Sequence, residues 1–180
     1  MDKFIIKGGK SLFGSVKVGG AKNASLALIP SALLTSGVSK LYNTPGLNDV
    51  YTMLKLVRHL GADAQFENDV VTIDTTGVAV LEAPYEHVKK MRASVYVLGP
   101  LLARYGYAKV SLPGGCAWGP RPINLHIEGL KKLGAQIDLV DGYIVAKAKK
   151  LQGNRINFDV PSVGATGNLL MAAVLAQGET

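Results

Sequence analysis

Apolar residues recur first with helical and then with strand spacing in two stretches of the chain. Residues 50–73 read VYTMLKLVRHLGADAQFENDVVTI, and residues 123–146 read INLHIEGLKKLGAQIDLVDGYIVA, with apolar positions that match. Each pattern predicts a helix that ends near a glycine, Gly61 or Gly134, followed by two short strands. The strands are expected to be joined by the dipeptides Asn68-Asp69 and Asp141-Gly142.

A second helical pattern precedes each of these stretches. It occupies residues 24–37 and 93–106, and a third copy follows at 165–178. The first two copies carry a proline within the pattern, Pro30 and Pro100, which predicts a kink in each helix. A short strand is expected after each of these two helices, at 38–43 and 108–113.

The chain therefore repeats a unit of helix, strand, loop, helix, strand and strand, with a further strand linking to the next unit. Two copies are complete, and the third reaches Thr180 after its first helix. Because a repeat cannot bury its apolar face alone, we expect residues 21–180 to form an N-terminal repeat domain whose third repeat is cut short. Residues 4–20 alternate like a strand pair around Gly8-Gly9, and we assign 1–20 to another part of the molecule.

The composition indicates which class of protein the chain belongs to. The chain has 180 residues, 48% of them hydrophobic, which is typical of a globular protein. The longest nearly apolar stretch, 95–103, is far shorter than the roughly 20 residues of a membrane span, and no secretory signal begins the sequence. With one cysteine and three separated histidines, we predict a cytoplasmic protein without a structural metal.

The net charge of +7 predicts an anionic partner. Basic residues occur as scattered pairs, without a basic run or interleaved aromatic residues, which argues against nucleic acid. A pocket for small phosphorylated anions explains the charge equally well.

The lone cysteine, Cys116, lies in the sequence LPGGCAWGPRP at 112–122, five residues before Arg121. A free cysteine is often a small buried hydrophobe. Here glycines precede the thiol, prolines surround Arg121, and no apolar periodicity includes the cysteine, which favours a reactive role. The corresponding loop of the first repeat, 44–49, is much shorter, and function is often carried by such an elaborated loop.

The loops before the repeated helices are expected to converge on one face, because equivalent positions of a pseudo-threefold unit surround one axis. Lys22 and Asn23 begin the first helix, Arg92 begins the second, and SVGATGN at 162–168 begins the third. Free N–H groups at helix N-termini attract anions, and the cations add to that field.

These motifs resemble the UDP-N-acetylglucosamine 1-carboxyvinyltransferase family. The resemblance covers GGAKNASLALIPSALLT, TPGLNDV, MRASVYVLGPLLARYG, SLPGGCAWGPRPINLHIEGLKKLGA and PSVGATGNLLMAA, which is nearly the whole chain. It implies an inside-out α/β barrel of βαβαββ units, of the kind found in EPSP synthase, and a second, C-terminal domain across an active-site cleft. The implied reaction transfers the enolpyruvyl group of phosphoenolpyruvate to the 3-hydroxyl of UDP-N-acetylglucosamine, the first committed step of peptidoglycan synthesis, without metal or cofactor.

The resemblance also implies roles for particular residues. Lys22 and Arg121 would hold phosphoenolpyruvate, with Asn23 between it and the sugar, and Cys116 would be the general acid toward C3 and the target of fosfomycin. The nucleotide-sugar site would be lined by Arg92, Tyr96, Arg121, Pro122, Ile123, Asn124, Leu125, Ser162, Val163 and Gly164.

Some positions depart from the common family pattern. Tyr96 stands where Trp is frequent, Asn124 where Asp is frequent, Trp118 where a small aliphatic residue is frequent, and Val160 where many members have Lys. The change at position 124 removes a charge beside the nucleotide segment, and the change at 160 removes one expected phosphate contact.

Two alternatives remain open from the sequence. The sister enzyme 5-enolpyruvylshikimate-3-phosphate synthase shares the fold and phosphoenolpyruvate, but it lacks the cysteine loop. A truncated module that binds the nucleotide sugar without turnover is the other, and we expect residues 1–180 alone to be inactive.

Overall fold

The computed structural model describes residues 3–112 and 123–180. The first repeat consists of α1 (Lys22–Ser31), η1 (Ala32–Leu34), β1 (Val38–Leu41), α2 (Asn48–His59), β2 (Asp63–Glu67), β3 (Val70–Asp74) and β4 (Glu82–Ala83). The second consists of α3 (Tyr85–Val88), η2 (Arg92–Val97), α4 (Leu98–Tyr105), β5 (Tyr107–Ser111), α5 (Asn124–Lys132), β6 (Gln136–Val140) and β7 (Tyr143–Lys147). The third contributes α6 (Val163–Ala173). This order confirms the predicted α/β repeat.

The two sheets share an arrangement of three strands, as expected for two copies of one unit, and the second sheet has one further strand. The first sheet has the order β1-β3-β2 and is antiparallel. The second has the order β4-β5-β7-β6, in which β4 is parallel to β5 and the other pairs are antiparallel. The linking strand that the pattern predicts is β4, and its counterpart is an isolated parallel bridge between Gln152 and Gln177.

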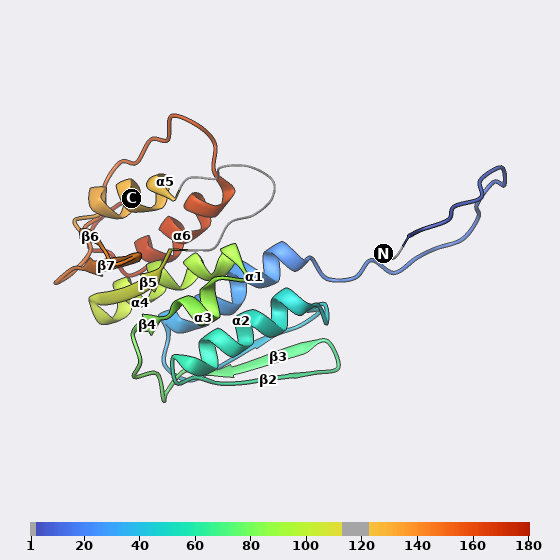
Figure 1. The fold of residues 1–180 in the computed structure, drawn as a ribbon, viewed down its shortest axis with the longest axis horizontal. Helices are drawn as coiled ribbons and strands as arrows, with labels where there is room; N and C mark the ends of the chain where they lie inside the picture. Colours follow the sequence, from blue (N-terminus) through green and yellow to red (C-terminus); the bar gives the residue numbers. More distant parts are fainter. Residues whose placement is uncertain (1–2, 113–122) are drawn as a thin grey trace.

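In Figure 1, β2 and β3 lie at the lower edge of the body and β6 and β7 at its left edge, with α1, α3 and α4 between them. The three equivalent helical segments, α1, η2 with α4, and α6, contact one another. Their apolar faces form one core with the sheets, and its largest fully buried side chains include Ile29, Leu54, Leu98, Leu101 and Leu130. Helices inside and sheets outside are the arrangement expected of an inside-out barrel.

The turn residues have the backbone conformations that the sequence predicts. Asn68 and Asp69 have φ values of 49° and 60°, and Asp141 and Gly142 have 51° and 78°, as a two-residue hairpin turn with two positive φ angles requires. Gly61 follows α2 with φ at 102°. Polar turn residues and glycines thus set the register of both hairpins.

The proline in the second copy has a different effect from the predicted kink. Instead of one bent helix over 93–106, the chain forms the 3-10 helix η2 and then the α-helix α4. Pro100 is the third residue of α4, where the backbone N–H has no partner within the helix, so proline costs little there. Pro30 lies in the last turn of α1, and the chain then tightens into η1.

The first described residues, 3–21, form neither a helix nor a strand. They run away from the body of the molecule and return to it (Figure 1), with Phe4 and Phe13 almost fully exposed. Two isolated strands are marginal in water without a further layer to cover them, which explains why the expected strand pair does not form. The assignment of 1–20 to another domain stays a prediction.

Candidate functional site

One large cavity lies where the repeated helices begin. Its volume is about 850 Å³, within the range of small-molecule sites. It is lined from the start of α1, the start of η2 and the start of α6, so the predicted convergence of these three segments is confirmed. Its polar lining includes Lys22, Asn23, Asp49, Lys90, Arg92, Tyr96, His126 and Ser162.

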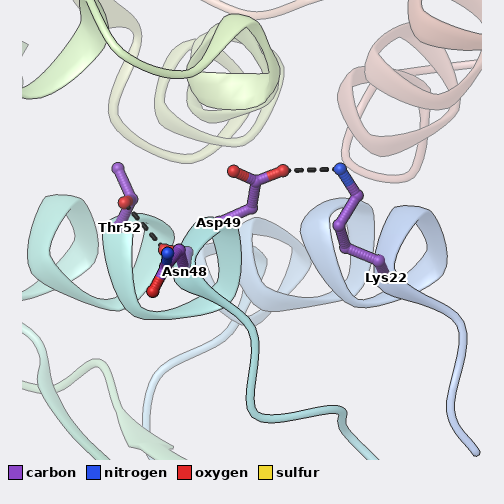
Figure 2. A network of polar contacts seen from close by, with 4 residues as sticks. All are labelled: Lys22, Asn48, Asp49 and Thr52. Carbon is purple, nitrogen blue, oxygen red and sulfur yellow. Dashed lines mark hydrogen bonds and ion pairs between the residues drawn. The ribbon is translucent and has the colours of Figure 1, made fainter. Parts of the chain in front are cut away.

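Lys22 and Asp49 join the first repeat's two helices at the cavity. Lys22 is the first residue of α1, and Asp49 lies in the first turn of α2. Nζ of Lys22 lies 2.6 Å from Oδ2 of Asp49 (Figure 2), and both side chains are about two-fifths exposed, at 43% and 38%. The lysine is therefore held at the cavity wall and can still meet a ligand from the solvent side.

The first turn of α2 also contains a side-chain hydrogen bond within the helix. Oγ1 of Thr52 donates a hydrogen bond to the backbone oxygen of Asn48 at 2.8 Å (Figure 2). Asp49 also lies at the positive end of α2, where a carboxylate is stabilised. The start of α2 therefore places Asp49 at the cavity, where it pairs with Lys22.

The third repeat supplies a capped helix start. Ser162 precedes α6, and its Oγ accepts a hydrogen bond from the backbone N–H of Ala165 at 3.2 Å. Val163 and Gly164 then begin the helix on the cavity wall, and the side chain of Val163 is exposed. The positive end of α6 therefore faces the cavity beside Arg92 and Lys22.

The second repeat contributes Arg92 and Tyr96, both in η2. Burial raises the pKa of Tyr96, which keeps the phenol protonated at neutral pH. Its ring lies against α6, because a Cβ at Gly167 would come within 3.2 Å of it. Tyr96 thus places a neutral, amphipathic side chain between η2 and α6 at the cavity.

His126 lies on α5 and is buried, with 5% of its surface exposed. Burial lowers its pKa to about 4, and the nearby charge of Arg92 acts in the same direction. Nδ1 of His126 lies 3.0 Å from the side-chain nitrogen of Asn168. The histidine is therefore neutral at physiological pH.

The cavity includes most of the residues that the sequence singled out. Those that line it are Lys22, Asn23, Arg92, Tyr96, Ile123, Leu125, Ser162, Val163 and Gly164. Asn124 begins α5 and is not among the described lining residues. Cys116, Arg121 and Pro122 lie outside the described residues, so their proposed roles stay predictions.

Asp49 and His126 are lining residues that the sequence reasoning missed. A signal for the first was present: the repeat offset of 73 positions, seen in LGAD at 60–63 and LGAQ at 133–136, relates position 122 to Asp49. No comparable signal marks His126, because its contact to Asn168 joins residues that are 42 positions apart.

No helix in the described ranges is long and apolar enough to cross a membrane. Within the same ranges, no three His, Cys, Asp or Glu side chains are grouped so that they could hold a metal ion.

Comparison with known proteins gives a consistent result. Residues 6–180 match the family model described as EPSP synthase (3-phosphoshikimate 1-carboxyvinyltransferase). Over its whole length the chain is 57% identical to a UDP-N-acetylglucosamine 1-carboxyvinyltransferase of Chlorobium limicola and 58% identical to one of Geotalea uraniireducens. It spans 43% of the length of each of these relatives.

Solved structures share the fold at low sequence identity. The enolpyruvyl transferase NikO from Streptomyces tendae superposes with a TM-score of 0.78 at 22% identity, over 95% of this chain and 40% of that one. EPSP synthase from Acinetobacter baumannii superposes with a TM-score of 0.72 at 21% identity, over 92% and 39%. The α/β architecture of repeated units is therefore shared with these proteins.

Proposed function

The chain belongs to the EPSP synthase family, and we propose that it takes part in enolpyruvyl transfer from phosphoenolpyruvate to the 3-hydroxyl of UDP-N-acetylglucosamine. One observation carries the proposal: three helix starts with Lys22, Arg92 and Ser162 meet at a single cavity. The names of the relatives at 57% and 58% identity support this acceptor. The reaction would serve peptidoglycan synthesis in the cytoplasm, and through it cell shape and division.

The proposed chemistry is an addition followed by an elimination. An acid protonates C3 of phosphoenolpyruvate, the sugar hydroxyl attacks C2 and loses its proton, and a tetrahedral ketal forms. The bond from C2 to the phosphate oxygen then breaks as C3 loses a proton, which restores the double bond and releases phosphate. Fixed cations suffice to stabilise the carboxylate and phosphate charges during both steps.

The residues of the cavity fit these requirements. We assign Lys22 to the phosphoenolpyruvate site together with Arg121, and Asn23 to the contact between donor and sugar. Arg92 and the capped start of α6 provide a cation and free N–H groups for the diphosphate of the nucleotide sugar. We assign the remaining predicted residues, positions 121 to 125, to the nucleotide-sugar site.

Cys116 is our proposed general acid. It is the only cysteine of the chain, so a single covalent adduct identifies it without ambiguity. The reference thiol pKa of about 8.5 favours the protonated form, whereas neighbouring cations favour thiolate. We propose that bound anionic substrate offsets the cations and restores the proton.

Fosfomycin alkylation, followed by intact mass, tests the role of the thiol. The rate is measured against pH with and without UDP-N-acetylglucosamine, and Cys116→Ser is the control. We expect one adduct on the unmodified chain, none on the variant, and different pH profiles with and without substrate. Identical profiles in the two conditions would reject the proposed coupling.

Because the chain spans 43% of its relatives' length, we propose that turnover requires a further domain, while the cavity alone binds the nucleotide sugar. Calorimetry of the 180-residue chain with UDP-N-acetylglucosamine and with shikimate 3-phosphate tests the choice of acceptor. Binding of the first and not the second supports the proposal, and the reverse supports the sister enzyme.

Phosphate release from phosphoenolpyruvate is the second measurement. Binding of UDP-N-acetylglucosamine without phosphate release supports the alternative of a binding module for this chain. Lys22→Met should weaken the binding of phosphoenolpyruvate more than the binding of the nucleotide sugar. An equal loss for both ligands would contradict the assignment of Lys22 to the donor site.

A further inference from the structure

Asn168 is a fully buried polar side chain on α6 that contacts three other elements. Its Oδ1 accepts a hydrogen bond from the backbone N–H of Gly99 in α4 at 2.8 Å. Its Nδ2 donates to the backbone oxygen of Val95 in η2 at 3.1 Å, and it lies 3.0 Å from Nδ1 of His126 in α5. A buried amide costs stability unless it is fully hydrogen-bonded, and this one is.

The two backbone partners determine which way the amide points. The N–H of Gly99 can only donate, and the carbonyl of Val95 can only accept. Rotating the amide by half a turn would place NH₂ against N–H and oxygen against oxygen. The nitrogen of Asn168 therefore faces His126 as a donor.

The orientation of the amide in turn fixes the protonation of the imidazole. Because Nδ2 of Asn168 donates, Nδ1 of His126 must accept, and the proton of the neutral ring is on Nε2. An imidazolium would place two N–H groups against each other. Burial and the charge of Arg92, which lower the pKa of His126 to about 4, favour the same neutral form.

The Nε2 edge of the ring faces the start of α6 at the cavity. A Cβ at Gly164 would lie 3.5 Å from Nε2 of His126 and 3.9 Å from the hydroxyl of Tyr96, so the missing side chain leaves this edge uncovered. His126 and Gly164 both line the cavity. The contact to Asn168 uses Nδ1 of the ring and not Nε2.

We propose that Asn168 is a positioning residue that holds His126 in the Nε2–H tautomer, so that the ring offers one neutral N–H to an acceptor oxygen of the bound nucleotide sugar. The ligand in this statement rests on the proposed function, whereas the tautomer rests on the amide geometry alone. A neutral donor adds no charge to a wall that already carries Lys22, Lys90 and Arg92. A single tautomer also keeps the N–H pointing in one direction, whereas a ring that exchanged between two tautomers would not.

Nitrogen-15 NMR of the imidazole rings tests the tautomer directly. The other two histidines, His59 and His87, stack on each other with ring centroids 4.5 Å apart and do not line the cavity. The double variant His59→Asn/His87→Asn leaves His126 as the single histidine to be observed. We expect Nε2 to be protonated and Nδ1 unprotonated at pH 7, and the reverse tautomer or an imidazolium would overturn the proposal.

Asn168→Asp, made in the same double variant, distinguishes a positioning role of Asn168 from a purely structural one. A carboxylate beside Nδ1 attracts the proton, so we expect Nδ1 to become protonated and the ring to titrate at higher pH. Asn68→Asp, an exposed turn residue, is the matched control and should leave the ring unchanged. If Asn168→Asp lowers stability and the ring keeps its Nε2 proton, the residue is only structural and the positioning role is wrong.

Titration with UDP-N-acetylglucosamine tests the donor role. We expect the Nε2 resonance of His126 to shift together with the backbone amides of Val163 and Gly164. If these amides shift and Nε2 does not, the donor role is wrong although the cavity binds the nucleotide sugar. If none of them shifts, the proposed function of the chain and the donor role both fail, while the tautomer measured without ligand still decides the role of Asn168.

Discussion

Lys22 and Asp49 form an ion pair at 2.6 Å between the starts of α1 and α2, on the wall of the cavity. The carboxylate therefore competes with any anionic ligand for the same amine. An exposed pair of this kind contributes roughly 0.2 to 1 kcal/mol. The same range limits how much the ion pair can weaken the binding of an anionic ligand to Lys22.

We predict that Asp49→Asn raises the affinity for phosphoenolpyruvate by up to about fivefold at low salt, because Lys22 no longer has an anionic partner in the free protein. The gain should shrink as the salt concentration rises. Calorimetry at two ionic strengths measures it. Asp138→Asn, an exposed carboxylate on β6, removes the same charge and should change little. Weaker binding by Asp49→Asn would indicate that the carboxylate orients Lys22 for the ligand.

Gly99→Ala tests the close approach of α4 and α6. A Cβ at this position would lie 2.5 Å from the backbone oxygen of Asn168, which a rotamer change cannot relieve. We expect the variant to lose about 1 to 3 kcal/mol of unfolding free energy, measured by urea denaturation. Gly19→Ala, where nothing lies within 4 Å of the added carbon, is the control. Equal stability of both variants would mean that the two helices can separate without cost.

The stability of the chain should fall in mild acid because His126 is buried and neutral. Its pKa is about 4 in the folded chain, against about 6.5 when unfolded, so below pH 6.5 the unfolded state binds the extra proton. This contribution is complete above pH 6.5 and is lost as the pH falls toward 4. It amounts to on the order of 3 kcal/mol.

Urea denaturation at a series of pH values measures that loss. His126→Gln removes the titrating group and should flatten the curve between pH 6.5 and 4, whatever its stability at pH 7. A variant that loses as much stability as the original chain over this range would show that other groups cause the acid sensitivity.

Residues 3–19 should contribute little to the stability of the rest of the chain. Phe4, Leu12 and Phe13 are 98%, 93% and 96% exposed, so they bury almost no apolar surface. The chain first meets the body at Gly20, where an added Cβ would collide with the backbone oxygen of Asn43. We expect deletion of residues 1–18 to change the unfolding free energy by less than about 0.5 kcal/mol. A larger loss would reveal packing of this segment against the repeats.

The repeat order could be predicted because local chemistry determines each element. Gly61 and Gly134 end helices with positive φ, and Asn68-Asp69 forms the first hairpin turn, so the spacing of these residues was enough. The division of residues 93–106 into two helix types was missed. It depends on where Pro100 falls relative to the first turn of α4, and apolar periodicity does not locate a helix start that closely.

The candidate site could be predicted in part for the same reason. Lys22, Arg92 and Ser162 each begin an equivalent helix, so the repeat alone indicates that they converge. The pairing of Asn168 with His126 could not be found this way, because it depends on the relative rotation of two packed helices. Side-chain partners across a helix interface have no period along the sequence.

The contact between Gly99 and Asn168 also bears on how the cavity responds to a ligand. Backbone atoms of α4 and α6 meet there without an intervening side chain, and a buried amide bonds across the contact. The second and third repeats are therefore in direct backbone contact at this crossing. A ligand that drew the start of α6 inward would strain this contact unless α4 moved with it, which favours a joint displacement of two repeats over the movement of a single helix.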